Sequence, residues 1–138
     1  MLYPWLDLTR ATSSKSPNQP TDWLTTFDAD GTQRDCIDVY CGSLIKSASD
    51  PRVSPLFRKP SSRLPKQFLS AGQAEVLFAD ARLWAEKCRS ESGDEAIEHH
   101  FAQDQVHTFA IGGWLADAGV ESVSDQRLST FVKRQIEQ

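Results

Sequence analysis

Apolar residues recur at helical spacing only in the second half of the chain. A capping pattern formed by Ser70 and Gln73 precedes a stripe of apolar positions that would line one side of a helix. This stripe consists of Leu77, Ala81, Trp84 and Cys88. The polar run at 90–94 ends the pattern, so a helix is predicted from about residue 70 to about residue 90.

A second apolar stripe begins after Glu95 and predicts another helix, with Ile97 and Phe101 on one face. The apolar positions from 106 to 115 lie on a rotated face, so the helix is expected to break or bend near Asp104. Gly119 is a natural C-terminal cap. A last helix is expected to be capped by Ser122 or Ser124 and to carry Leu128, Phe131, Val132 and Ile136.

The first half has a different pattern, because all seven prolines lie at or before Pro65 and proline interrupts helices. Residues 23–41 alternate in polarity around the turn-forming residues 28–31, which predicts a β-hairpin. Its second strand would carry Ile37, Val39 and Cys41 on one face. Residues 47–66 show no periodicity and are expected to form a loop.

These patterns predict an α+β fold. A short N-terminal hairpin or small antiparallel sheet would be followed by a long basic, proline-rich loop and three or four C-terminal helices. The 138 residues form one expected domain. Its parts are an apolar segment with a linker (1–21), the hairpin region (22–46), the basic loop (47–69) and the helical part (70–138).

Composition narrows the class of protein. The net charge of −4 argues against a surface that binds nucleic acid over its whole extent. No apolar run approaches the roughly 20 residues of a spanning helix, so no membrane partner is expected. The odd number of cysteines is a poor disulfide framework. A small protein of the cytoplasm is therefore expected.

Positive charge gathers in the basic loop, where residues 52–66 carry five basic side chains and no acid. No catalytic grouping outweighs a structural explanation of the same residues, so the chain is interpreted as a non-catalytic binding or regulatory protein without a cofactor. Another protein is the expected partner, and a homo-oligomer or a nucleic acid is possible. The expected contact residues are Arg58, Lys59, Arg63, Tyr3 and Trp5.

Two alternatives stay open. Residues 114–134 resemble a helix-turn-helix hairpin, whose last helix would offer Arg127, Lys133 and Arg134 to DNA phosphates. The second alternative is a small metal-dependent hydrolase. On a helix, the spacing of His100, Asp104 and His107 would place two imidazoles and a carboxylate on one face, a donor set that suits zinc, manganese or iron.

Overall fold

The computed structural model of the chain describes residues 1–24, 32–43, 45–61, 64–109 and 118–137. Its three helices are α1 (Thr32–Cys41), α2 (Phe78–Ser92) and α3 (Ala118–Ile136), and its two strands are β1 (Gln67–Gly72) and β2 (Ile97–Ala102). Short 3₁₀ turns lie at Ser13–Lys15, Pro55–Phe57 and Asp94–Ala96.

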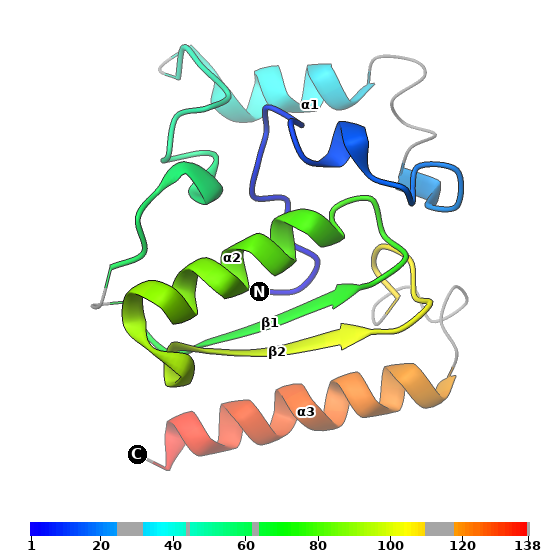
Figure 1. Cartoon of the computed structure of the whole chain (residues 1–138), viewed down its shortest axis with the longest axis vertical. Helices are drawn as coiled ribbons and strands as arrows, with labels where there is room; N and C mark the ends of the chain where they lie inside the picture. The colour runs from blue at the N-terminus through cyan, green and yellow to red at the C-terminus, as the bar shows by residue number, and fades with distance from the viewer. Residues whose placement is uncertain (25–31, 44, 62–63, 110–117, 138) are drawn as a thin grey trace.

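The two strands pair in parallel, with Gln67 opposite Ile97 and Gly72 opposite Ala102. Parallel neighbours cannot be joined by a tight turn, so the chain must cross over between them. Helix α2 makes this crossover, and Gly93, at φ +89°, ends it with an N–H bond to the Arg89 carbonyl. The centre of the structure is therefore a β-α-β unit (Figure 1).

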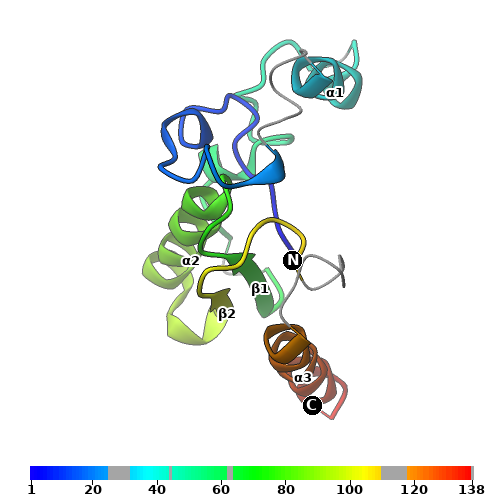
Figure 2. The ribbon, with the colours of Figure 1, turned by 90° about the vertical axis from the view of Figure 1, so that its right-hand side faces the viewer.

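Helices cover the strands from both sides. Helix α2 lies on one face and α3 on the other, as the two perpendicular views show (Figures 1 and 2). Under α2 the strands contribute Leu69, Ala71 and Ile97, each at most 2% exposed. On the α3 side, the Phe68 ring packs 5.6 Å from that of Phe131. Because β1 is buried on both faces, its sequence does not alternate in polarity.

The N-terminal residues extend the sheet beyond β1. Leu2 forms a parallel bridge with Ser70, through bonds from the Tyr3 N–H to the Ser70 carbonyl (2.9 Å) and from the Ser70 N–H to the Met1 carbonyl (3.0 Å). Strand β1 is therefore central, with β2 on one edge and Met1–Tyr3 on the other.

A buried carboxylate in the first turn of α2 fixes the segment that follows. One oxygen of Asp80 accepts the backbone N–H groups of Leu6 (3.1 Å) and Asp7 (2.9 Å), and the other accepts the hydroxyl of Thr12. Asp80 is fully buried, and burial raises the pKa of its carboxyl above the ordinary value, while these hydrogen bonds act to lower it. The N-terminal apolar segment is thus part of the core.

The predicted α+β class is wrong, because the paired strands are parallel and joined by a crossover helix. The hairpin at 23–41 is also wrong. Residues 32–41 form α1, with backbone bonds inside the segment instead of to a partner strand; the turn residues 28–31 lie outside the described residues.

The segment after Glu95, for which a helix was expected, forms strand β2. Ile97 and Phe101 both lie on the side of β2 that faces α2, and their spacing of four residues fits a helix as well as a strand. Ser70 belongs to β1 and opens no helix. Gly119 lies inside α3, which runs without a break from residue 118 to residue 136. The stripe assigned to the first helix is confirmed: Leu77, Ala81, Trp84 and Cys88 are all buried.

Gly72 ends β1 at a point where another part of the backbone passes very close. A Cβ atom there would lie 2.1 Å from the Gln105 carbonyl oxygen and 2.9 Å from that of Val106. The approach lets the Ala74 N–H bond to the Gln105 carbonyl at 2.9 Å. The absence of a side chain at position 72 therefore allows the loops after the two strands to meet.

We predict that Gly72→Ala destabilises the protein by about 3 kcal/mol, the upper part of the range for overpacking, because the obstructing atoms are backbone. Urea denaturation measures the change. Gly42→Ala is the matched control: Gly42 has φ +58° and nothing within 4 Å of its added Cβ, so only the conformational cost of about 1 kcal/mol remains. Equal losses in the two variants would contradict the close approach.

Candidate active site

Two loops meet at the carboxyl ends of the parallel strands. The loop after β1 begins at Gln73, and the loop after β2 begins at residue 103 and is described up to residue 109. The Gln73 N–H donates to the Ala102 carbonyl at 2.8 Å, which joins the loops at their origin. In sheets of this type, ligands bind in the crevice at the carboxyl ends of the strands, so this edge is where a site is expected.

Glu75 is the acidic group of this edge, and its side chain is completely buried. Its Oε2 accepts the Gly72 N–H at 3.2 Å, whereas Oε1 has no hydrogen-bond partner among the described residues. Burial raises the pKa of the Glu75 carboxyl above its ordinary value, while His107 and the Gly72 N–H oppose the shift. Such a group is costly to bury and is typical of functional sites.

His107 faces this carboxylate from the other loop. Its Nδ1 lies 3.5 Å from Oε2 of Glu75, and only 12% of its side chain is exposed. The aromatic rings of Tyr3 and Trp23 enclose the imidazole, at 5.7 Å and 5.9 Å between centroids. The separation is at the outer limit of a hydrogen bond, as catalytic contacts often are before a reactant binds.

The backbone around His107 is strained. Thr108 follows it at φ +60°, a conformation that a β-branched residue rarely adopts, and Asp104 lies at φ +56° three residues earlier. Strain of this kind persists where the surrounding structure imposes it, and it gathers at functional sites.

A buried carboxylate beside Nδ1 of an imidazole forms an acid–base unit. The carboxylate favours the tautomer with the proton on Nδ1 and stabilises the imidazolium once it forms. Nε2 is then the atom that takes up or releases a proton. The arrangement can therefore serve as a general base followed by a general acid.

The metal hypothesis is wrong for the residues it named. His100 lies within β2, Asp104 in the following turn and His107 in the loop, because this segment is not a helix. The described part of the chain contains no group of three His, Cys, Asp or Glu side chains that could hold a metal ion. The ring of His100 instead lies 6.4 Å from that of Phe109.

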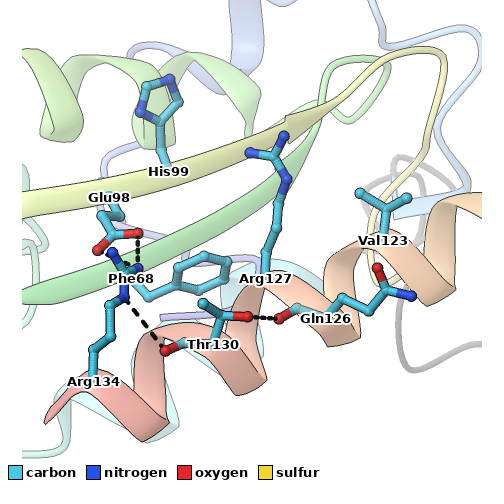
Figure 3. A pocket seen from close by; sticks show the side chains of 8 residues that line it. All are labelled: Phe68, Glu98, His99, Val123, Gln126, Arg127, Thr130 and Arg134. Atoms are coloured by element: carbon cyan, nitrogen blue, oxygen red, sulfur yellow. Dashed lines mark hydrogen bonds and ion pairs between the residues drawn. The ribbon is translucent and has the colours of Figure 1, made fainter.

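The helix-turn-helix hypothesis is wrong from residue 118 onward, where α3 is a single helix; residues 114–117 lie outside the described residues. Arg134 pairs with the carboxylate of Glu98 on β2 at 2.6 Å. Arg127 extends from α3 toward the sheet and lines a cavity of about 300 Å³ together with Phe68 (Figure 3). Lys133 is exposed.

The residues expected to contact a partner lie in several places. Tyr3 is buried with Ala102 and Phe109, and the indole N–H of Trp5 donates to the Asp7 carbonyl at 2.9 Å. Arg58 is exposed, Lys59 pairs with Glu91 of α2 at 3.0 Å, and Arg63 lies outside the described residues. Among the described residues, Tyr3 and Trp5 are thus held in the N-terminal segment while Lys59 pairs with α2, and a partner contact through the predicted set stays a prediction.

Glu75 was missed by the sequence analysis, and His107 was assigned to a different group. A signal was present: Glu75 lies three residues after the end of β1, and His107 lies five residues after the end of β2. Once the two segments are recognised as parallel strands, similar offsets from their carboxyl ends place both residues at one edge.

Comparison with known proteins decides the family. Residues 1–111 match the family described as the alpha/beta hydrolase fold. The chain belongs to this family. The match covers most of the chain and includes both Glu75 and His107.

Solved structures agree on the α/β hydrolase fold. A hormone-sensitive lipase from a metagenome library is 24% identical with a TM-score of 0.78, over 97% of this chain and 43% of its own. The hormone-sensitive lipase homologue EstE7, also from a metagenome library, is 26% identical with a TM-score of 0.77, over 99% and 43%. An esterase from the bacterial hormone-sensitive lipase family is 22% identical with a TM-score of 0.75, over 98% and 42%. A comparison with curated proteins returned no match.

This α/β hydrolase chain therefore spans less than half the length of the solved relatives named here. The family overturns the interpretation as a non-catalytic binding or regulatory protein. None of the helices in the described part of this chain is long and apolar enough to cross a membrane.

We predict that Glu75 makes the stability of the chain fall as the pH rises. Its folded pKa lies above the unfolded value of 4.5, so the native state binds this proton more tightly than the unfolded state. The resulting stability is present at low pH and is lost as the pH rises from about 4.5 through the folded pKa. Glu75→Gln lacks this contribution.

Urea denaturation between about pH 4 and pH 8 measures the difference in unfolding free energy between wild type and Glu75→Gln. This difference should decrease with pH. Glu86→Gln, a change at an exposed position of α2, is the matched control over the same pH range. A pH-independent difference for Glu75→Gln would contradict the raised pKa.

Proposed function

We propose that this chain supplies the acid–histidine part of a serine hydrolase site that cleaves carboxylic esters. The observation that carries the proposal is the contact between buried Glu75 and Nδ1 of His107, at the carboxyl ends of two parallel strands of an α/β hydrolase chain. Relatives named as esterases and lipases support the choice of an ester as the substrate class.

In this proposal, Nε2 of His107 removes the proton from a serine hydroxyl as its oxygen attacks the ester carbonyl. The imidazolium then gives this proton to the departing alcohol, which leaves an acyl-serine. A water molecule, deprotonated by the same Nε2, attacks the acyl group and releases the carboxylic acid. Glu75 keeps Nδ1 protonated and stabilises the imidazolium in both halves of the reaction.

The nucleophile would come from outside these 138 residues. The nucleophile motif of this fold, G-x-S-x-G, does not occur in the sequence. In this fold the triad residues follow the chain order serine, acid, histidine. Glu75 and His107 have the order of the last two. This agrees with a chain that spans 43% of the length of the metagenome-library hormone-sensitive lipase.

A location in the cytoplasm also remains a proposal. It is supported by the three cysteines, Cys36, Cys41 and Cys88, all of which are free thiols in the structure. Structural disulfides are rare in reducing compartments.

The proposal is tested by joining residues 1–138 to the nucleophile-bearing part of the metagenome-library hormone-sensitive lipase, in place of the region that matches. Hydrolysis of p-nitrophenyl butyrate is followed by absorbance. We predict that His107→Ala and Glu75→Gln each lower kcat by about 10⁴-fold or more, because the general base or its correct tautomer is lost. KM should change little.

His99→Ala and Glu86→Gln serve as matched controls, because both side chains lie away from the loops of the site. These variants should keep kcat within about twofold of the unmodified fusion, with unchanged circular dichroism. Near-normal hydrolysis by a folded His107→Ala fusion would refute the assignment.

A further inference from the structure

We propose that a single N-terminal segment, residues 18–24, positions both members of the acid–histidine pair. The inference deepens the proposed function and rests on it. Asn18, Asp22 and Trp23 act here as positioning residues: each hydrogen-bonds to the backbone of a loop that carries Glu75 or His107, and Trp23 also packs its ring beside the imidazole.

Asn18 holds the loop that carries Glu75. Its side-chain Nδ2 donates to the carbonyl of Gln73 at 2.8 Å and to the carbonyl of Glu75 itself at 3.0 Å. Two carbonyls of one turn are thus bound by a single amide group, which contributes both of its N–H donors. The bond to the Glu75 carbonyl restricts the backbone from which the catalytic carboxylate projects.

Asp22 holds the same loop from its other end. Its Oδ2 accepts the N–H of Val76 at 2.6 Å, and its Oδ1 accepts the N–H of Leu24 at 3.1 Å. Only 2% of Asp22 is exposed, so the bonds form away from solvent, where they are strong. Its charge also contributes, after burial, to the raised pKa of Glu75. Asp22 therefore affects both the position of the Glu75 loop and the pKa of the Glu75 carboxyl.

Trp23 holds the loop that carries His107. Its indole Nε1 donates to the His107 carbonyl at 3.0 Å, and its ring lies 5.9 Å from the imidazole centroid. The next residue, Thr108, has a strained backbone at φ +60°, so a fixed partner for the preceding carbonyl helps to impose this conformation. The indole thus restricts the direction of the imidazole by binding its main chain.

The residue separations show why this arrangement matters. Asp22 reaches 54 residues ahead to Val76, and Trp23 reaches 84 residues ahead to His107. Neighbouring residues of one short segment therefore fix two loops that come from different strands. The contact of 3.5 Å between Glu75 and His107 depends on the relative position of those loops, and small displacements at such a contact have large catalytic effects.

Trp23→Phe tests the inference on the full 138-residue chain, since it keeps an aromatic ring and removes only the indole donor. Nitrogen-15 NMR of the His107 ring, at a pH where it is neutral, reports the fraction of molecules with the proton on Nδ1. We predict that this fraction falls by about twofold or more in Trp23→Phe, because Nδ1 moves away from Glu75.

Trp5→Phe is the matched control. It removes a similar indole bond, from Nε1 of Trp5 to the Asp7 carbonyl at 2.9 Å, that has no contact with the loops of the site. It should leave the His107 tautomer fraction unchanged. Asn18→Asp is the second variant: it removes both amide donors at nearly constant volume, and it should shift the tautomer fraction in the same direction without unfolding the chain.

An unchanged His107 tautomer fraction in Trp23→Phe and Asn18→Asp would overturn the positioning role, and so would an equal change in Trp5→Phe. This failure is distinct from failure of the proposed function. Ester hydrolysis that survives His107→Ala would refute the catalytic assignment even if Trp23→Phe shifts the tautomer. Hydrolysis that requires Glu75 and His107, together with an unshifted tautomer, would refute only the role of the segment.

Discussion

The parallel pairing of β1 with β2 is the constraint on which the rest of the structure depends. Two strands that run in the same direction end at the same edge, so the loops that follow them must meet there. The crossover through α2 separates Glu75 from His107 by 32 positions in the sequence and still brings their side chains to 3.5 Å. Gly72 makes the meeting possible, because any side chain at that position would collide with the second loop.

The site is built at a cost in stability. A fully buried carboxylate loses its interactions with water. For Glu75, the hydrogen bond from the Gly72 N–H and the contact with His107 replace only part of this lost free energy. Two non-glycine residues of the loop after β2, Asp104 and Thr108, adopt positive φ angles. Asp80 is equally buried in α2, but its two oxygens accept the N–H groups of Leu6 and Asp7 and the hydroxyl of Thr12. Oε1 of Glu75 has no such partner among the described residues, so incomplete pairing and backbone strain coincide where chemistry is proposed.

The sequence could predict α2 but not the strands, and the reason is physical. The stripe from Leu77 to Cys88 faces one layer of core, and this produces the periodicity of an amphipathic helix. Strand β1 is buried on both faces and has no alternation to detect. In β2, the spacing of Ile97 and Phe101 fits a helix as well as a strand. Only their parallel pairing, a long-range property, distinguishes the two interpretations.

The site could not be predicted from the sequence for the same reason, because neither strand that leads into its loops was recognised as a strand. On an expected helix, His107 was grouped with residues at helical spacing, and its actual partner was 32 positions away in the segment assigned to a different helix. Glu75 gives no distinguishing signal in the sequence, since single acidic residues are common at the start of helices. A carboxylate becomes informative only when it is buried, and burial is not visible in a local pattern.

The edge of the sheet formed by Met1–Tyr3 indicates from which side the proposed serine would approach. Met1–Tyr3 pair with β1 through the Tyr3 N–H and the Met1 carbonyl, so in a parallel ladder the N–H and carbonyl of Leu2 point to the opposite edge. Tyr3, at the end of this segment, packs against the imidazole of His107. A further parallel strand beside Met1–Tyr3 would end close to His107. Because the nucleophile of this fold stands on a strand-to-helix turn, the proposed serine would reach Nε2 from that edge.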